Sequence, residues 1–250
     1  MATWVFLRGL VREQRHWGGF VDQFRDAMPG ASVVTLDLPG NGALHNQPSP
    51  STVRGMVLSC RQQLRAMNIA GPFHLLAMSM GGMVAAQWSV DHLDEVHAQV
   101  LINTSMRPLS PVYHRLRVGN YAALLGLLLG RASAVQWERA ILRMTSNAPH
   151  DDVLAQWVQW HAQYPVSRRN AMRQLWAAAR FRVCLEKPTV PTLILASRHD
   201  HLVSVHCSER LADQWQVPLR LHPTAGHDLP LDDGLWVIEQ ICHATDFLKA

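Results

Sequence analysis

Short apolar runs rich in β-branched residues are spaced along the chain. They are Trp4–Leu7, Ser32–Leu38, Phe73–Met78, Ala98–Asn103, Thr192–Ala196 and Leu219–His222. Most of these runs lack the alternation of a half-exposed strand, which predicts strands buried on both faces. Helix-length segments such as Thr52–Met67 and Met80–Val90 lie between them. This alternation predicts an α/β fold with a mostly parallel, doubly wound sheet.

One stretch interrupts the alternation. From Arg107 to Glu186 no segment has the pattern of a strand, and apolar residues recur at helical spacing instead, as Trp157 and Trp160 do. Ligands of doubly wound sheets bind beyond the carboxyl ends of the strands. We therefore predict a core of residues 1–106 and 187–250, with residues 107–186 inserted as a helical cap over that edge.

Length and composition predict one compact domain. The chain has 250 residues, of which 48% are hydrophobic and 17% charged, so it can bury a large core. The apolar start, Met1–Leu7, is followed by Arg8 and lacks a basic leading region, so we interpret it as a strand and not as a signal peptide. The longest apolar run, Ala122–Leu129, is too short for a membrane span, which needs about 20 residues.

The cysteines give no sign of a disulfide framework or a metal site. None of them forms a C-x-x-C pair, which favours ordinary packing. They are Cys60, Cys184, Cys207 and Cys242. A reducing compartment fits this usage, and we expect a cytoplasmic protein.

The segment Ala77-Met78-Ser79-Met80-Gly81 has the form of a nucleophile elbow. A strand-like run precedes it and a helix-length segment follows, and the residues two before and two after Ser79 are small, as a crowded strand-to-helix turn requires. The backbone N–H of Met80 then lies at a helix N-terminus, where it can donate to an oxyanion. The alternative is a turn of small residues with an incidental serine.

Two further residues complete a candidate catalytic triad. Asp200 follows the run Thr192–Ala196, and His227 follows the run Leu219–His222, so each lies at the same sheet edge as Ser79. A serine hydroxyl needs a base, and the base needs an orienting carboxylate. We predict that Ser79 is the nucleophile, His227 the base and Asp200 the acid. Taken alone, Asp200 could be a loop or N-cap residue and His227 a surface histidine.

A metal site is the competing interpretation of this histidine-rich loop. Its candidate ligands are His199, Asp200, His201 and His206. No H-E-x-x-H spacing and no cysteine partner accompanies them, which disfavours that site. The predicted chemistry needs neither a metal nor an organic cofactor.

The residues of this triad and their order resemble the α/β-hydrolase family, in which the nucleophile, the acid and the histidine follow one another in this sequence. The similarity covers nearly the whole chain. Leu36–Gly42 looks like the family's D-x-P-G-x-G loop, and we interpret it as a tight turn. Among subfamilies, the chain is most similar to small bacterial carboxylesterases of the pimeloyl-acyl-carrier methyl esterase type. The resemblance implies the α/β-hydrolase fold and serine hydrolase activity.

The same resemblance extends to the oxyanion hole. Leu7–Leu10 takes the place of the family's strand-ending His-Gly loop, which makes the N–H of Leu10 the second oxyanion donor. Trp17 matches an aromatic residue that packs beside this loop, and we include it among the substrate-binding candidates. The chain departs from the family pattern at Ala77, where the elbow usually has Gly, and at Arg8, where His is usual. Arg8 changes the side-chain chemistry near the substrate.

Positive charge is concentrated in the predicted cap. Residues 107–186 contain eleven Arg, no Lys and four acidic residues, so the cap carries +7 and the remainder −3 of the net +4. Arginine forks match phosphate and carboxylate geometry. This charge predicts either an acidic carrier protein or phosphate-bearing handle as a partner, or only a solvated helical surface. No nucleic-acid recognition motif accompanies it.

The function that these features favour is hydrolysis of a carboxylic ester with an apolar acyl part. Trp157 and Trp160 are candidates for the acyl pocket, although tryptophans of a cap also pack it against the core. One alternative is acyl thioesterase or acyltransferase activity on carrier- or coenzyme-bound groups. Another is non-catalytic ligand binding on the same fold.

Overall fold

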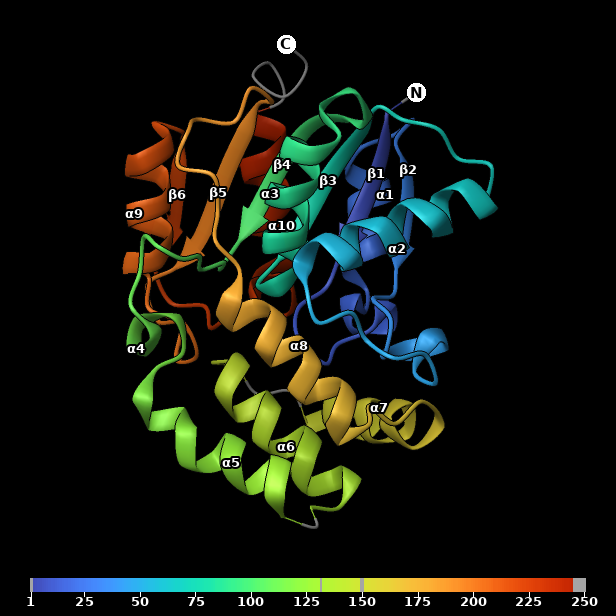
Figure 1. The fold of residues 1–250 in the computed structure, drawn as a ribbon, viewed down its shortest axis with the longest axis vertical. Coiled ribbons are helices and arrows are strands. Elements are labelled where there is room, and N and C mark those ends of the chain that lie inside the picture. The colour runs from blue at the N-terminus through green and yellow to red at the C-terminus, as the bar shows by residue number, and fades with distance from the viewer. Residues whose placement is uncertain (1, 131, 149–150, 245–250) are drawn as a thin grey trace.

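The computed structural model describes residues 2–130, 132–148 and 151–244 of the chain (Figure 1). The ends of the predicted core, and Arg131 and residues 149–150 of the predicted cap, lie outside the described residues. The strands form one six-stranded, all-parallel sheet in the order β2-β1-β3-β4-β5-β6. They are β1 (Thr3–Leu7), β2 (Ser32–Leu36), β3 (Phe73–Met78), β4 (Val96–Ile102), β5 (Thr192–Ser197) and β6 (Leu219–His222). The strand ends expected from sequence agree with these to within two residues.

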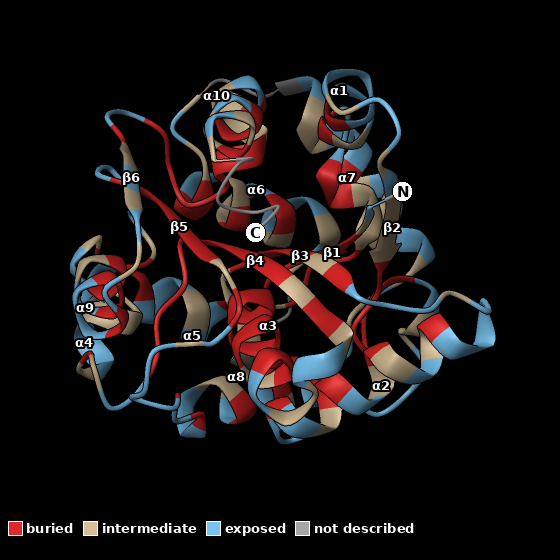
Figure 2. Cartoon of the chain, turned by 90° about the horizontal axis from the view of Figure 1, so that it is seen from above, coloured by how far each residue is buried: buried red, intermediate tan, exposed pale blue. Residues whose placement is uncertain are grey.

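Helices cover both faces of this sheet (Figure 2). One face carries α1 (Phe20–Ala27) and α10 (Leu229–His243). The other face carries α2 (Val53–Ala66), α3 (Met80–Asp91) and α9 (His206–Trp215). The predicted doubly wound α/β architecture is therefore confirmed. Short 3-10 helices lie in the connections: η1 (Gln14–Trp17), η2 (Gly42–Leu44) and η3 (Leu93–Glu95).

Because helices cover both faces of the sheet, the strands consist of continuous apolar runs. In β1, Trp4 and Phe6 belong to the core cluster on the α1 side, where Phe24 packs edge-to-face against both rings. Val5 and Leu7 belong to the cluster on the α2 and α3 side. Successive side chains of a strand point to opposite faces, so each position needs an apolar residue when both faces are dry.

The strand ends are aligned where the site is built. Leu7 at the end of β1 pairs with Ala77 in β3, and Ala77 pairs with Leu101 in β4. Parallel strands all deliver their following loops to the same edge of the sheet. The loops after β1, β3, β5 and β6 therefore converge at one edge, which faces the cap (Figure 1).

The described residues between 107 and 186 form a layer of helices beyond that edge (Figure 1). They are α4 (Val112–Arg115), η4 (Val118–Asn120), α5 (Tyr121–Leu129), α6 (Ala134–Thr145), α7 (Asp151–Gln163) and α8 (Arg168–Arg180). Ser133 and Ser167 cap the N-termini of α6 and α8 by accepting backbone N–H bonds, as N-cap serines do. A small apolar cluster inside this layer includes Leu127, Ile141 and Trp157. Among the described residues, no helix has the length and apolar character needed to span a membrane.

Candidate active site

Ser79 lies at the tip of the turn between β3 and α3. Its backbone has φ +55° and ψ −116°, a conformation that is strained for a residue with a side chain. The Ser79 N–H donates to the Ile102 carbonyl at 2.8 Å, and its own carbonyl accepts from the Thr104 hydroxyl at 2.8 Å. These contacts to the end of β4 hold the turn in its strained form.

Small residues around Ser79 are required by close backbone contacts. A Cβ atom at Gly81 would clash with the carbonyl oxygens of Leu7 and Arg8 at the end of β1. A Cβ atom at Gly9 would lie 3.0 Å from the Cβ of Ser79. The elbow and the loop after β1 can therefore approach each other only because glycine occupies both positions.

His227 and Asp200 form a buried pair at the neighbouring strand ends. The Nδ1 atom of His227 lies 2.7 Å from Asp200 Oδ2, and both side chains are almost completely buried. Asp200 Oδ1 also accepts the backbone N–H groups of Leu202 and Val203, each at 2.8 Å. A carboxylate only accepts hydrogen bonds, so the His227 proton is assigned to Nδ1, which leaves Nε2 free to accept a proton.

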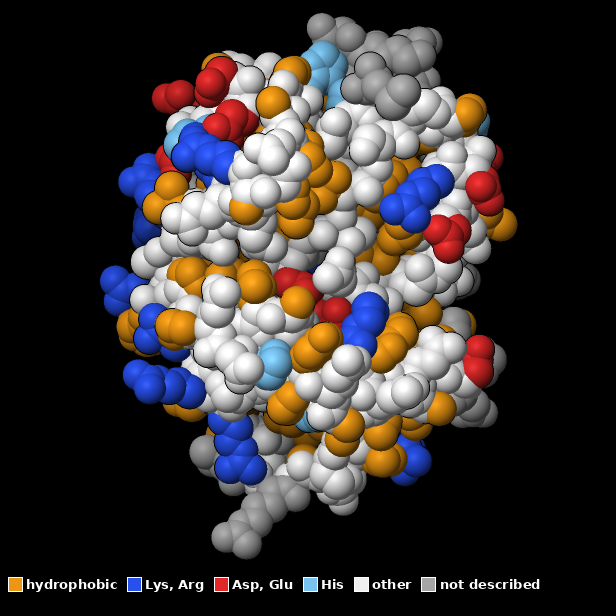
Figure 3. Space-filling view, turned by 90° about the vertical axis from the view of Figure 1, so that its right-hand side faces the viewer, with side chains coloured by type: hydrophobic (Ala, Val, Ile, Leu, Met, Phe, Trp, Pro, Cys, Tyr) orange, Lys and Arg blue, Asp and Glu red, His pale blue; other side chains and the backbone are white. Residues whose placement is uncertain are grey.

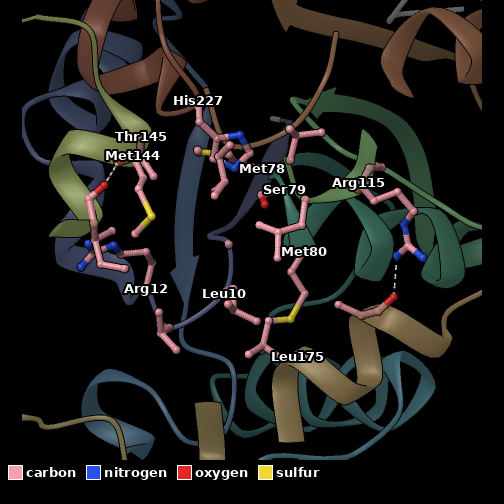
Figure 4. A pocket seen from close by; sticks show the side chains of 18 of the residues that line it. Leu10, Arg12, Met78, Ser79, Met80, Arg115, Met144, Thr145, Leu175 and His227 are labelled. Atoms are coloured by element: carbon pink, nitrogen blue, oxygen red, sulfur yellow. Dashed lines mark hydrogen bonds between the residues drawn. The ribbon is translucent and has the colours of Figure 1, made fainter. Parts of the chain in front are cut away.

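Ser79 and His227 line the same cavity and point into it (Figure 4). The Ser79 hydroxyl has no hydrogen bond to any side chain or backbone group of the described residues. Contacts between a nucleophile and its base are often longer in free enzymes than in substrate complexes. The arrangement therefore provides a nucleophile and an oriented base that face a common space.

Two backbone N–H groups adjoin the nucleophile. Met80 is the first residue of α3, so its N–H has no acceptor within the helix. The N–H of Leu10 donates to no acceptor among the described residues. Leu10, Met80 and Ser79 all line the cavity (Figure 4). The Met80 and Leu10 N–H groups are therefore the candidate donors of an oxyanion hole.

Arg8 forms a buried ion pair beside this hole. Its Nη1 and Nη2 atoms donate to Oδ1 and Oδ2 of Asp228 at 3.1 and 2.5 Å, and both side chains are 2% exposed. The guanidinium also lies over the ring of Trp17, 4.8 Å from its centre. Asp228 thus faces Arg8, whereas Asp200 faces His227. Asp228 therefore neutralises the Arg8 charge, which leaves no net positive charge from this pair beside the substrate.

The cavity beside Ser79 is mainly apolar. Its volume is about 190 Å³. Leucine, methionine and other aliphatic side chains from the core and the cap form most of its wall, including Leu10, Met80, Met83, Val112, Leu116, Leu124, Ile141, Met144, Leu175 and Leu202. Arg115 lies in the wall (Figure 4) and donates to the Ala178 carbonyl at 2.6 Å, so it is held by the end of α8. An apolar group of a ligand fits this space.

The three tryptophans expected at the substrate lie elsewhere. Trp17, Trp157 and Trp160 are not among the described residues that line the cavity beside Ser79, and they adjoin a second hollow of about 450 Å³ between η1, α7 and α10. Trp157 is buried beneath the Arg12 guanidinium, 4.2 Å from its ring centre. Their assignment to the acyl pocket is corrected accordingly: Trp157 and Trp160 pack on His16 of η1, and Trp17 packs in the core against Phe6 and Phe20.

One polar residue of the site was missed from sequence. Asn103 follows β4 with φ +46°, and its side-chain Nδ2 donates to the His227 carbonyl at 2.8 Å. Its Oδ1 accepts the Ser197 N–H at 2.9 Å. Asn103 thus ties the loop of the histidine to the end of β5. An asparagine at a strand end is the only sequence signal of this role.

The histidine-rich loop brings no metal cluster together among the described residues. Nowhere in the described residues do three His, Cys, Asp or Glu side chains gather as metal ligands. Asp200 instead uses its carboxylate for His227 and two backbone groups, while His206 pairs with Glu209 at 2.6 Å.

A serine on a strained turn after the central strand, with a buried His–Asp pair on two later loops of a parallel sheet, is the arrangement of an α/β-hydrolase. Sequence comparison agrees, because the family described as the Alpha/beta hydrolase family matches residues 4–240, and the chain belongs to that family.

Similar proteins carry several activities in their names. A protein of Pseudomonas syringae pv. syringae (strain B728a), provisionally named carbamate hydrolase RutD, is 27% identical over 245 residues, covering 93% of this chain and 89% of that protein. The solved structure of a thermophilic esterase from Thermogutta terrifontis superimposes with a TM-score of 0.79 at 18% identity, over 100% of this chain and 91% of that one. The structure of the provisionally assigned non-heme bromoperoxidase BpoC from Mycobacterium tuberculosis H37Rv superimposes with a TM-score of 0.79 at 23% identity. The match covers 100% of this chain and 94% of that one. Likeness at this identity establishes the fold.

Proposed function

We propose that the chain is a serine hydrolase that cleaves a carboxylic ester through an acyl-enzyme on Ser79. The observation that carries this proposal is the 2.7 Å contact between His227 Nδ1 and Asp200 Oδ2, beside a cavity into which Ser79 and His227 both point. A purely structural histidine would not need to share a cavity with a strained serine. An oriented base with a free Nε2 is what the nucleophile needs.

The chemistry follows from the positions of these groups. His227 Nε2 takes the proton of the Ser79 hydroxyl as Oγ attacks the ester carbonyl. The N–H groups of Met80 and Leu10 stabilise the negative charge on the carbonyl oxygen. His227 then gives its proton to the leaving alkoxide, and a water molecule releases the acyl group with His227 again as base. Asp200 keeps the imidazole in the correct tautomer throughout.

The apolar cavity favours an apolar acyl part. Its wall carries mostly Leu, Met, Val and Ile side chains, and two of the charged residues that line it, Arg8 and Asp228, neutralise each other. An acyl chain gains about 0.8 kcal/mol for each buried CH₂ group in such a space. The esterase name of one structural neighbour supports an ester. The carbamate hydrolase name of the RutD relatives makes carbamates, together with thioesters, the alternatives to test.

A fluorophosphonate probe and a substrate panel test this proposal. The probe should label Ser79, and Ser79→Ala should lose both the labelling and the hydrolysis of esters, since losing a triad member costs on the order of 10⁴ to 10⁶ in rate. Ser208 is buried on α9, is not among the described residues that line the cavity, and is the matched control. Ser208→Ala should still be labelled and active. A Ser79→Ala protein with wild-type turnover would refute the proposal.

We further propose that the acyl group can be presented on an acidic carrier protein or a phosphate-bearing handle. Several cap arginines are exposed, among them Arg139, Arg143, Arg168 and Arg169. On the face in Figure 3, basic side chains run down the left-hand edge into the lower part, where the cap lies. An exposed cationic surface around an acyl-binding cavity favours anionic acyl donors by steering their approach.

A further inference from the structure

The loop that carries the second oxyanion donor contains a strained valine. Val11 has φ +51°, and it is the β-branched residue among the non-glycine positions with positive φ in the described chain. A β-branched side chain is very unfavourable in this left-handed region. Val11 directly follows Leu10, the proposed second oxyanion donor. Within the loop, the Arg12 N–H donates to the Gly9 carbonyl at 3.3 Å, and further hydrogen bonds come from outside the loop.

Two buried amide side chains hold it. The Val11 N–H donates to Gln174 Oε1 at 2.9 Å. Gln174 Nε2 donates to Asn41 Oδ1 at 2.8 Å, and Asn41 Nδ2 donates to the Arg12 carbonyl at 2.9 Å. Gln174 and Asn41 are both fully buried. The Leu10–Val11 peptide and the Arg12 carbonyl are thus joined by one continuous chain of hydrogen bonds, which we call the Gln174–Asn41 clamp.

The clamp holds the peptide next to the one that carries the Leu10 N–H. The φ angle of Val11 sets the orientation of the Leu10–Val11 peptide plane relative to the rest of the loop. Return of Val11 to a negative φ would turn this plane and take its N–H away from Gln174. The adjoining Gly9–Leu10 peptide, which supplies the oxyanion donor, would shift with it because Gly9 offers little resistance to rotation.

We propose that Gln174, supported by Asn41, is a positioning residue for the oxyanion hole. It acts through the backbone of Val11 and keeps the Leu10 N–H aimed at the developing oxyanion. This inference rests on the proposed function, in which Leu10 is an oxyanion donor. It adds that a side chain of the cap assembles part of the catalytic site.

The three parts of the clamp come from separate elements. Gln174 lies on α8 of the cap, Asn41 lies in the loop after β2, and Val11 lies in the loop after β1. Leu175, next to Gln174, lines the cavity together with Leu10 (Figure 4). The D-x-P-G-x-G loop is therefore more than a turn: its Asn41 couples the docking of α8 to the shape of the oxyanion loop.

The first test is Gln174→Met, which keeps the volume and removes both hydrogen bonds. Turnover should fall by roughly 10- to 100-fold, less than the 10²–10³ lost with an entire oxyanion donor. KM should stay nearly constant, because the oxyanion bond strengthens only in the transition state. Affinity for a boronic acid that forms a tetrahedral adduct with Ser79 should fall in parallel with kcat/KM.

Relief of the strain supplies a sharper test. Glycine tolerates positive φ, so Val11→Gly should remove the need for the clamp. The double variant Val11→Gly with Gln174→Met should be more active than Gln174→Met alone. Val11→Ala is the matched control, since alanine shortens the side chain but keeps the strain. Val11→Ala with Gln174→Met should show no recovery.

Asn170 separates oxyanion positioning from general docking of the cap. It lies one turn before Gln174 on α8 and accepts the Ser49 N–H at 2.9 Å, without a hydrogen bond to the oxyanion loop. Asn170→Ala should lower the thermal stability and leave kcat far less affected than Gln174→Met does. Equal kcat losses for the two variants, or no recovery with Val11→Gly, would overturn the inference. Wild-type protein without ester hydrolysis or Ser79 labelling would instead refute the proposed function.

Discussion

At the scale of single residues, Arg8 shows how a buried partner changes the meaning of a substitution. In the α/β-hydrolase family this position is usually histidine. From the sequence we expected the Arg8 side chain to change the chemistry near the substrate. In the structure, both guanidinium Nη atoms donate to Asp228. The same contact removes Asp228 as a competing partner of His227. The two acids of this site therefore have different partners: Asp200 contacts His227, and Asp228 contacts Arg8.

Exchange of either acid for its amide should separate these tasks. Asp200→Asn should keep the fold, since an amide oxygen can still accept from Leu202 and Val203, but turnover should fall by about 10⁴ because the amide upsets the His227 tautomer. Asp228→Asn should cost about 3–5 kcal/mol of unfolding free energy, because it leaves the Arg8 charge buried and unpaired. It should cost much less turnover than Asp200→Asn.

Steady-state kinetics and urea unfolding of the two variants measure these effects. The predicted outcome is a crossed pattern, with turnover lost in one variant and stability lost in the other. If Asp200→Asn were nearly silent in turnover while Asp228→Asn was inactive though folded, the roles of the two acids would have to be exchanged.

At the scale of elements, η1 is joined to the cap through a buried polar cluster. Arg12 Nη1 donates to Glu138 of α6 at 2.6 Å and to His16 Nε2 at 2.9 Å. His16 also packs against the rings of Trp157 and Trp160 on α7. Burial by itself raises the pKa of Glu138, but Arg12 and His161 outweigh it and hold that pKa below its ordinary value. For His16, burial first and the Arg12 charge second lower the pKa well below 6.5.

Stability should therefore fall as the solution becomes acidic. Below pH about 6.5 the unfolded chain protonates His16 while the folded chain keeps it neutral, so protons favour unfolding. One such group contributes a slope of up to about 1.4 kcal/mol per pH unit. The contribution is fully present above pH 6.5 and is lost on acidification. His16→Gln, which retains an acceptor for Arg12, should show a shallower dependence.

Urea unfolding of the wild type and of His16→Gln between pH 7.5 and 5 measures the difference, in which carboxylates common to both proteins cancel. Equal m-values would show that the unfolded states are comparable. Parallel curves over this range would show that His16 is not the responsible group.

At the scale of the whole molecule, the cap and the core carry net charges of opposite sign. The cap, residues 107–186, carries +7 and the remainder −3, and Arg131 of this set lies outside the described residues. Some of these arginines have structural contacts: Arg168 donates to the Gly130 carbonyl and Arg173 to the Ser49 carbonyl. Arg168 is nevertheless exposed, as is Arg169. The cap is thus the layer that an anionic partner would meet first.

Charge reversal at Arg168 and Arg169 to Glu should raise KM for an acyl group on an acidic carrier and leave a small neutral ester unaffected. Steering acts on encounter and is screened beyond a Debye length of about 8 Å at physiological salt, so activity on the carrier substrate should also fall steeply with added salt. Reversal of Arg25 and Arg220, two exposed arginines of the core, is the matched control. Equal effects on both substrates would show that the cap arginines do not bind a carrier and only form a solvated surface.

The sequence by itself predicted the elements and the positions of the candidate triad. Strands such as β3 were predicted because burial on both faces forces a continuous apolar run. The elbow at Ser79 was predicted because crowding at a strand-to-helix turn admits only small neighbours such as Gly81. Both signals are local, since each depends on residues a few positions apart and on the periodicity of one element. The helices within residues 107–186 were predicted in the same way, from helical spacing and the lack of strand-like runs.

Only the tertiary structure decided which side chains meet. Arg8 binds Asp228, which lies 220 positions later in the sequence, and Val11 binds Gln174, which lies 163 positions later. The cap tryptophans, expected at the substrate, pack instead beside η1. No local pattern specifies such contacts, because they depend on how the cap and the loops dock after each element has formed. Local periodicity determines where an element lies in the chain, whereas the packing of elements determines the partner of each buried polar group, and here that packing sets the chemistry around Ser79.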